Sequence, residues 1–363
     1  MTEDGILATR LQPEPQRRQP KGRRDLLLGV VGGYVAASMA ARAQEAGAGP
    51  TALSHDAQTR GPAPIPPAER GLQAVAAVSW FKVSDAAFAI EGPAFDRDGN
   101  LYVCDASGGH VLRLTPEKQL STFVTMDLRP GGLAFHRDGR LFIAALDIPR
   151  GVGAVMEVRA DGSELRAVVP PDAGYMPNDL VFDAQGGLYF SDFRGTSTDP
   201  RGGIYYVAPN APMVMPVLPR IAQGNGVALN PDGRVLWATE FGANRLHRVE
   251  LADAATATPL GTAVPYRFTG PAPDSMRVDA EGNVYVAIYG QGRVLAFNQK
   301  GIPIGQILLP GREEGHNLLC TNTAFLPGSR ELLIVASDGD GGQGTSIFRA
   351  GAFAPALTLF SHR

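Results

Sequence analysis

A sixfold repeat is the feature that most constrains how this chain can fold. A short apolar segment, a D-x-x-G-like turn and a second apolar segment recur along the sequence. The copies are GPAFDRDGNLYVCD, GGLAFHRDGRLFIAAL, NDLVFDAQGGLYFSD, NGVALNPDGRVLWATE, DSMRVDAEGNVYVAIY and NTAFLPGSRELLIVAS. Their first segments end at Phe95, Phe135, Phe182, Leu229, Val278 and Phe325, at steps of 40, 47, 47, 49 and 47 residues. This period is typical of a propeller blade of four strands.

The repeat predicts an all-β chain, a six-bladed β-propeller. Each D-x-x-G turn suits a hairpin, because glycine readily adopts a positive φ. Third strands are expected at 110–115, 202–208, 244–251 and 292–298. A solenoid is the alternative, but the absence of capping helices favours closure into a ring. The apolar segment at 72–83 is expected to pair into the last blade and close it.

The N-terminal region is predicted to direct export rather than to form part of the folded domain. Residues 21–43 read KGRRDLLLGVVGGYVAASMAARA, with a twin arginine before a modest apolar stretch and an A-x-A cleavage site at its end. We interpret 1–43 as a twin-arginine signal peptide, 44–70 as a disordered linker and 71–363 as the propeller. The product would be periplasmic or secreted, without stable membrane insertion after cleavage. A membrane anchor is the alternative, although the apolar stretch is short for a 30 Å core.

Charge and cysteine content narrow the possible partners and redox chemistry. The 363 residues carry a formal net charge of −3 and no long basic block, so we do not expect nucleic acid as a partner. Cys104 and Cys320 are the two cysteines, and each lies in or beside an apolar run. We expect buried free thiols, and a single long-range disulfide stays open for an exported chain.

A second feature of the repeat is a shared position four residues before each aligned anchor. The residues there are Glu91, Gly131, Asn178, Asn225, Asp274 and Thr321. In a propeller the innermost strand of each blade lines the central channel, so equivalent positions should converge on the axis. The alternative is that each polar residue caps a turn or bonds the backbone at the start of its strand.

Two carboxylates and two amides at this position indicate a cation site. A buried Glu and a buried Asp close together need compensation of their charge. Such a hard oxygen site suits Ca²⁺, with Mg²⁺ or Mn²⁺ as further possibilities. The six histidines show no H-x-H or H-E-x-x-H pairing, so a structural zinc site is not expected.

The sequence lacks the motifs that mark several other functional classes. No G-x-S-x-G, Walker or dinucleotide-binding glycine motif is found. Asp105, Asp192 and Glu240 recur at the ends of the second strands, where we expect them to bond neighbouring turns or, alternatively, to support the ring.

These motifs resemble the gluconolactonase, regucalcin and senescence-marker family. The resemblance rests on E-G-P at Glu91, P-N-D at Asn178, N-G at Asn225 and P-D-S at Asp274, and covers roughly 85–350. Long phrases such as DFRGTSTDPRGGIYYV and YVAIYGQGRVLAFNQKGIPIGQILLPGREEGH bring it nearest to the drug-responsive lactonase branch of Gram-positive cocci. That branch usually has an acid where this chain has Asn178.

The resemblance implies a calcium-dependent lactonase acting on a small-molecule lactone. Glu91, Asn178, Asn225, Asp274 and Ser275 would hold Ca²⁺, for which Mg²⁺, Mn²⁺ or Zn²⁺ are possible substitutes. Asp274 would transfer the proton of a water bound to the metal. The branch implies a monomer or weak dimer.

Two further residue assignments remain open. The resemblance to the lactonase branch also implies a second, structural calcium in the loops before Asn178. These loops are short and poor in donors here, and Asp172 and Tyr175 are the residues that could still serve. His316 in GREEGH is expected in a surface loop, or alternatively as a substrate contact.

Rival functions are phosphotriester (organophosphate) hydrolysis on the same metal and a non-catalytic ligand-binding propeller. The sequence does not discriminate among lactones, because substrate choice lies in loops without a repeat.

Overall fold

The computed structural model describes residues 52–53, 57–209, 211 and 213–363. The predicted signal peptide and most of the predicted linker lie outside these residues. The chain divides into two units, Met1–Ser54 and His55–Arg363, and the strands found in the described residues all belong to the second. Among the described residues, no helix has the length and apolar character needed to cross a membrane.

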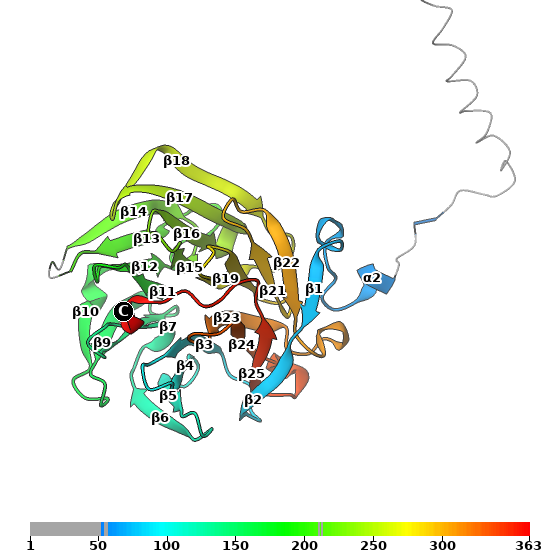
Figure 1. The fold of residues 1–363 in the computed structure, drawn as a ribbon, viewed down its shortest axis with the longest axis horizontal. Coiled ribbons are helices and arrows are strands. Elements are labelled where there is room, and N and C mark those ends of the chain that lie inside the picture. Colours follow the sequence, from blue (N-terminus) through cyan, green and yellow to red (C-terminus); the bar gives the residue numbers. More distant parts are fainter. Residues whose placement is uncertain (1–51, 54–56, 210, 212) are drawn as a thin grey trace, which may run out of the picture. The chain divides into compact units, whose positions relative to one another are not determined.

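The second unit is a six-bladed β-propeller, which confirms the predicted fold (Figure 1). Blade 1 contains β3 (Ile90–Phe95), β4 (Leu101–Asp105), β5 (His110–Leu114) and β6 (Leu120–Thr125). Blade 2 contains β7 (Arg129–Phe135), β8 (Leu141–Asp147), β9 (Val152–Val158) and β10 (Arg166–Val169). Blade 3 contains β11 (Pro177–Phe182), β12 (Leu188–Asp192), β13 (Gly202–Val207) and β14 (Val214–Ile221).

Blade 4 contains β15 (Gly224–Leu229), β16 (Val235–Glu240), β17 (Arg245–Asp253) and β18 (Thr256–Arg267). Blade 5 contains β19 (Pro273–Val278), β20 (Val284–Ile288), β21 (Arg293–Phe297) and β22 (Pro303–Leu308). Blade 6 contains β23 (Leu319–Phe325), β24 (Glu331–Ser337) and β25 (Thr345–Gly351). Short helices are α2 (Ala57–Arg60) and the 3-10 turns η1 (Pro67–Glu69), η2 (Pro171–Ala173), η3 (Phe241–Ala243), η4 (Arg312–Glu314), η5 (Gly339–Gly341) and η6 (Phe360–His362).

The N-terminal strands complete two blades rather than one. β2 (Val78–Ser84) pairs antiparallel with β25 and closes blade 6, as the sequence predicts. β1 (Gln73–Ala76) instead pairs parallel with β22 and adds a fifth strand to blade 5. The predicted single strand at 72–83 is therefore divided between neighbouring blades. The short break between the two strands lets the chain change sheets.

The end of the predicted linker is folded against blade 5. Glu69 is buried and forms an ion pair with Arg293, whose guanidinium also donates to the side chains of Gln291 and Gln306. Tyr266 donates a hydrogen bond of 2.5 Å to the Glu69 carboxylate. Buried charges persist where partners satisfy them, so this network fixes Glu69 in place. Residues up to 70 thus include part of the folded unit, which differs from the predicted boundary.

Apolar packing joins the blades edge to edge around the ring. Six clusters of buried residues each combine strands from two adjacent blades, and one of them joins Ile90 of blade 1 to Leu333 of blade 6. The inner strands β3, β7, β11, β15, β19 and β23 contact one another in a closed circle. Each blade therefore buries both faces of its sheet, which explains the near-continuous apolar character of the second strands.

The inner strands approach so closely that some positions admit only glycine. A Cβ atom on Gly226 of β15 would lie 2.9 Å from the carbonyl oxygen of Asp274 and 2.9 Å from the Cα of Ser275, both on β19. A Cβ on Gly92 of β3 would lie 2.2 Å from the carbonyl oxygen of Gly131 on β7. Because these are backbone atoms, an added methyl group cannot be accommodated by a side-chain rotation.

We predict that Gly226→Ala lowers the free energy of unfolding by about 2 kcal/mol, because the neighbouring strand must move. Urea unfolding followed by circular dichroism measures the change. Gly351→Ala is the matched control, since no atom lies within 4 Å of its added Cβ. Equal unfolding midpoints for the two variants would contradict this account of the inner strands.

Candidate functional site

All six inner hairpins are irregular at the same level of the channel. The strand register shifts between Glu91 and Ala94 in blade 1 and between Pro177 and Leu180 in blade 3. Equivalent shifts occur in the other four blades. A bulge of this kind places extra residues on the inner strand and re-aims their side chains. The sequence position that carries the amides and carboxylates therefore coincides with a break in regular pairing.

The structure places the predicted residues at equivalent points of the inner strands. Glu91, Asn178, Asn225 and Asp274 are the second residues of β3, β11, β15 and β19, respectively. We call these four side chains the polar ring. The remaining two blades present Gly131, which has no side chain, and Thr321, whose hydroxyl donates to the Ile90 carbonyl at 2.5 Å.

The two carboxylates of the polar ring lie close enough for their titration to be linked. Desolvation raises the pKa of Glu91 well above its usual range, and the charges of Asp274 and Asp179 raise it further. Burial likewise raises the pKa of Asp274, with Asp179 adding to the effect, whereas a hydrogen bond from Asn225 opposes it. Asp274 is 3% exposed. The site therefore concentrates negative charge where water cannot solvate it fully.

Two oxygens of the polar ring have no hydrogen-bond partner among the residues that the structure describes. Asn178 Oδ1 and Asp274 Oδ1 are both buried and unbonded. Buried acceptors are normally satisfied, so such atoms call for an explanation. Ser275, 1% exposed, donates to Asn225 Oδ1 at 3.3 Å and brings a further oxygen to the same place. The donor set consists of hard oxygens only, which fits a cation such as Ca²⁺.

The ring holds fewer acids than many metal sites. Across the described residues, no group of three or more His, Cys, Asp or Glu side chains is arranged to hold a metal ion. Only two ring members are carboxylates, so amide and hydroxyl oxygens have to supply the other ligands.

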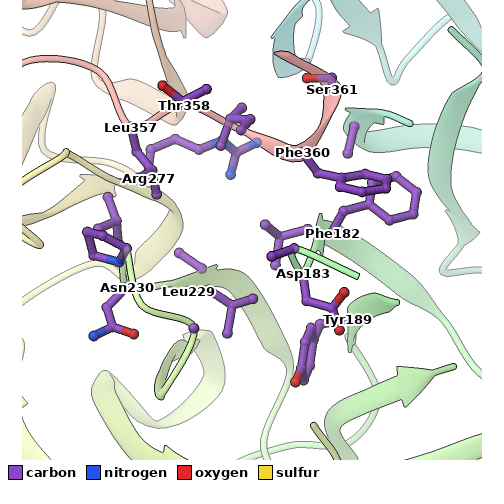
Figure 2. A pocket seen from close by; sticks show the side chains of 18 of the residues that line it. Phe182, Asp183, Tyr189, Leu229, Asn230, Arg277, Leu357, Thr358, Phe360 and Ser361 are labelled. Carbon is purple, nitrogen blue, oxygen red and sulfur yellow. The ribbon is translucent and has the colours of Figure 1, made fainter. Parts of the chain in front are cut away.

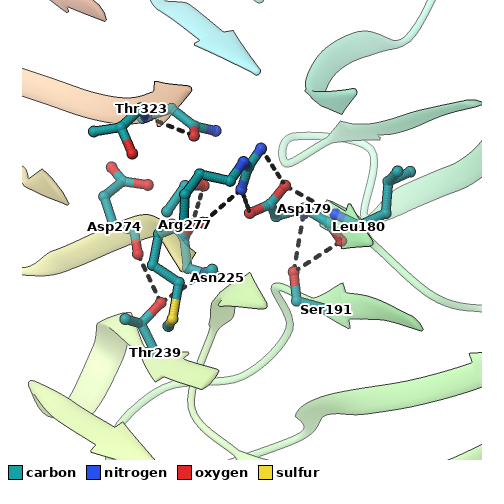
Figure 3. A network of polar contacts seen from close by, with 12 residues as sticks. Asp179, Leu180, Ser191, Asn225, Thr239, Asp274, Arg277 and Thr323 are labelled. Atoms are coloured by element: carbon teal, nitrogen blue, oxygen red, sulfur yellow. Dashed lines mark hydrogen bonds and ion pairs between the residues drawn. The ribbon is translucent and has the colours of Figure 1, made fainter. Parts of the chain in front are cut away.

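Two hydroxyls that the sequence analysis did not identify stabilise the bulges. Ser191 Oγ accepts a hydrogen bond of 2.9 Å from the backbone N–H of Asp179. Thr239 Oγ1 accepts one of 2.6 Å from the N–H of Gly226 and donates to the Asp274 carbonyl at 2.7 Å (Figure 3). Thr239 thereby joins blade 4 to the backbone of a ring residue in blade 5. The signal in the sequence was a hydroxyl residue immediately before Asp192 and Glu240 in otherwise apolar strands.

The acids at the second-strand ends bond nearby turns, which confirms the expectation for Asp105, Asp192 and Glu240. Their carboxylates accept hydrogen bonds of 2.8–3.0 Å from the backbone N–H groups of Gly108, Met176 and Ala222, respectively.

An aromatic row follows the second strands of three consecutive blades. Phe193, Phe241 and Tyr289 come directly after β12, β16 and β20, and all three are partly exposed. The Phe193 and Phe241 rings are 5.5 Å apart, and the Phe241 and Tyr289 rings are 6.0 Å apart. Burial raises the pKa of Tyr289, and the charges of Asp274 and Glu91 raise it further, so this ring lies within reach of the site's field.

The side chain of His316 contacts Asp338, which follows the second strand of blade 6. It lies in the loop between β22 and β23, and its Nδ1 is 3.1 Å from the Asp338 carboxylate. No hydrogen bond given for His316 reaches a ring residue. Its expected surface-loop position is thus observed, and its alternative role as a substrate contact stays a prediction.

The residues considered for a second calcium are not gathered into a ligand set. Tyr175 packs its ring 4.7 Å from that of Tyr205, with Arg194 5.3 Å above it, while Asp172 is exposed on η2. Cys104 and Cys320 are both buried free thiols, as expected. Burial raises the pKa of each thiol.

A large cavity of about 760 Å³ lies around the opposite ends of the inner strands (Figure 2). Its lining includes none of the four ring residues. Between ring and cavity, Arg277 of β19 forms an ion pair of 3.0 Å with Asp179 of β11 (Figure 3).

Comparisons with known proteins identify the family of the chain. The model of the SMP-30/Gluconolactonase/LRE-like region matches residues 90–337. The chain is 45% identical over 298 residues to lactonase drp35 of Staphylococcus saprophyticus, covering 80% of this chain and 92% of that one. It is 43% identical over 291 residues to lactonase drp35 of Staphylococcus aureus, covering 79% and 90%.

Solved structures share the fold at lower identity. A calcium-binding regucalcin from Agrobacterium tumefaciens has a TM-score of 0.63 at 22% identity, covering 79% of this chain and 99% of that one. A gluconolactonase from Xanthomonas campestris has a TM-score of 0.62 at 20% identity, covering 84% and 98%. With the family model matching most of the propeller and two relatives above 40% identity, the chain belongs to the SMP-30/gluconolactonase family.

Proposed function

We propose that this chain is a calcium-dependent lactonase that opens a cyclic ester at the polar ring. The observation that carries the proposal is the pair of unbonded, buried oxygens, Asn178 Oδ1 and Asp274 Oδ1, beside two acids of raised pKa. The relatives of similar length are named lactonases, which supports the same reaction class.

Glu91, Asn178, Asn225 and Asp274 would hold the cation, with Ser275 as an additional oxygen. Mg²⁺, Mn²⁺ or Zn²⁺ are possible substitutes for Ca²⁺. When bound, the cation supplies a Lewis acid that polarises the ester carbonyl. At the equivalent position blade 2 has Gly131, which supplies no side-chain ligand, so the cation would keep coordination positions for water or substrate.

Asp274 is the residue that moves the proton. Its Oδ1 has no hydrogen-bond partner among the described residues, so it can accept a proton from the attacking water provided that the other ring oxygens hold most of the cation's charge. The water oxygen bonds to the carbonyl carbon, the ring C–O bond breaks, and Asp274 returns the proton to the alkoxide that leaves. A carboxylate that binds a cation is a weak base, so this exchange requires Asp274 to be only loosely ligated.

Thr239 and Asn225 hold Asp274 in position for this step. Thr239 binds its backbone carbonyl, and the Asn225 side chain hydrogen-bonds its carboxylate. Both residues are at most 2% exposed, so the hydrogen bonds are shielded from competing water.

The aromatic row indicates the kind of lactone the site favours. Tyr289 lies close enough to feel the charges of Asp274 and Glu91, and Phe241 and Phe193 extend the apolar surface from it. A flat apolar face beside the reacting carbonyl favours a lactone fused to an aromatic ring over a polyhydroxylated sugar lactone.

For location, we propose export by the twin-arginine signal in residues 1–43, which would place the propeller in the periplasm or outside the cell.

We predict that Asp274→Asn lowers kcat for lactone hydrolysis by at least 100-fold, because the base is lost. Steady-state kinetics on an aromatic lactone and an aldonolactone measure the effect, and circular dichroism checks the fold. Asp172→Asn, which changes an exposed carboxylate, should retain wild-type kcat. Near-normal turnover in Asp274→Asn would remove Asp274 from the mechanism.

We predict that Ca²⁺ raises the melting temperature of EDTA-treated protein in a concentration-dependent way, because only the folded ring binds it. Asn178→Ala should require at least tenfold more Ca²⁺ for the same rise. Gln119→Ala, an exposed amide on blade 1, serves as the control and should match the wild type. A melting temperature that does not respond to Ca²⁺ would speak against a cation in the ring, and activity unaffected by EDTA would speak against its catalytic role.

We predict that Tyr289→Ala raises KM for an aromatic lactone about tenfold, the scale of one lost aromatic contact. KM for an aldonolactone should change less than threefold, and Tyr289→Phe should behave like the wild type on both substrates. If Tyr289→Ala raises KM equally for both substrates, the aromatic row does not select the substrate.

A further inference from the structure

The cavity at the far end of the channel contains one charged group at its inner end. Five of the six inner strands present a small apolar residue there, namely Ala94, Ala134, Val181, Ala228 and Ala324. In blade 5 the equivalent position is Arg277, which also lines the cavity (Figure 2). The small neighbours leave the space in front of the guanidinium open.

Asp179 uses only part of the hydrogen-bonding capacity of Arg277. Arg277 Nη1 donates to Asp179 Oδ2 at 3.0 Å and to the Met276 carbonyl at 2.6 Å, and Nη2 donates to Asp179 Oδ1 at 3.5 Å. A guanidinium has five N–H donors, so Nε–H and one Nη2–H have no partner in the described chain. Arg277 Nε is not fully buried, so a ligand can reach it.

The two free N–H groups lie on the same edge of the guanidinium. Such an edge matches the two oxygens of a carboxylate in a bidentate contact. The Arg277 side chain is 15% exposed, so an anion bound there would be largely shielded from water. Shielding strengthens a charged hydrogen bond that is geometrically satisfied.

Between Arg277 and the C-terminal segment, the walls of the cavity are apolar. The next layer consists of the strand ends Phe95, Phe135, Phe182, Leu229, Val278 and Phe325. Tyr189 of β12 also lines the cavity, and its hydroxyl donates to the Ala254 carbonyl. The remaining titratable residues of the lining belong to turns, to a strand end or to the C-terminal segment at the other end: Asp183, Asp232, Arg234, Asp253, His362 and Arg363. Asp183 is already satisfied, since its carboxylate accepts hydrogen bonds from Gly187 N–H and from the Tyr206 hydroxyl. A ligand would thus meet a cation at its head and hydrocarbon along its length.

The C-terminal segment encloses the cavity from outside. Ala356 bridges to Asp279 of blade 5, and the Phe360 ring packs 5.6 Å from the Phe182 ring of blade 3 (Figure 2). Arg97 of blade 1 fixes the segment further by donating to the Ser361 carbonyl at 2.6 Å. The segment therefore spans the mouth and is held at both ends, which gives the cavity a wall that an open channel would lack.

We propose that this cavity is a second ligand site, distinct from the polar ring, for an apolar monocarboxylate. Its carboxylate pairs with Arg277 Nε and Nη2, and its hydrocarbon body lies among the phenylalanine side chains. The volume of about 760 Å³ is within the range of sites that hold small organic ligands. The inference does not depend on the lactonase reaction, because it uses none of the ring residues.

Isothermal titration of the full chain with octanoate, in saturating Ca²⁺, tests the proposal. We expect one octanoate per chain, with 1-octanol, which has the same hydrocarbon body without the anion, binding at least tenfold more weakly. Arg277→Met should weaken octanoate binding at least tenfold. Ala94→Phe places a phenyl ring in the open space in front of the guanidinium and leaves the ion pair intact, so it should abolish binding even if Arg277→Met fails to fold.

Asp274→Asn separates this site from the ring. It should lose lactone turnover yet bind octanoate as the wild type does, so failure of either proposal is visible without the other. The second site is ruled out if octanoate does not bind, if octanol binds equally well, if binding survives Ala94→Phe or a folded Arg277→Met, or if Asp274→Asn abolishes it.

Discussion

The convergence of six inner strands on one axis is the constraint on which the rest of the structure depends. The strands approach so closely that Gly92 and Gly226 have backbone atoms of the next blade where a Cβ would stand. At that level every inner hairpin also shifts its register. The close approach of the inner strands excludes water from the axis. The bulges turn polar side chains toward the axis. The result is a desolvated cluster of oxygens that ordinary strand pairing would not produce.

The surrounding hydrogen bonds show how the fold tolerates this cluster. Ser191 and Thr239 satisfy backbone N–H groups that the bulges leave unpaired, and Thr239 also ties blade 4 to blade 5. Arg277 compensates the charge of Asp179, the third carboxylate near the axis. Two features of the polar ring are not compensated by neighbouring residues. The buried oxygens Asn178 Oδ1 and Asp274 Oδ1 have no hydrogen-bond partner in the described chain, and the carboxylates of Glu91 and Asp274 repel each other. A bound cation would relieve both, so the residual strain of the polar ring is itself an argument for its proposed role.

The two ends of the channel have opposite chemistry. One end presents oxygens and an aromatic row, and the other presents hydrocarbon with one cation at its inner end. This polarity follows from the direction of the inner strands, because all six begin at the ring and end at the cavity. The ion pair between Arg277 and Asp179 stands between the two ends. The propeller can thus carry two sites along one axis without sharing residues between them.

The sequence alone determined the blade number, the hairpins and the level of the polar ring, because a repeat aligned on one apolar anchor fixes every equivalent position. It also identified the candidate ligands Glu91, Asn178, Asn225 and Asp274 from residue type at that level. It could not reveal the pairing of β1 with β22, the burial of Glu69 or the contact of Arg277 with Asp179. These depend on segments up to 237 residues apart in the chain, as in the bond between Gln306 and Glu69. Only the closed ring brings such segments together, since no local pattern encodes which blade a distant side chain will face.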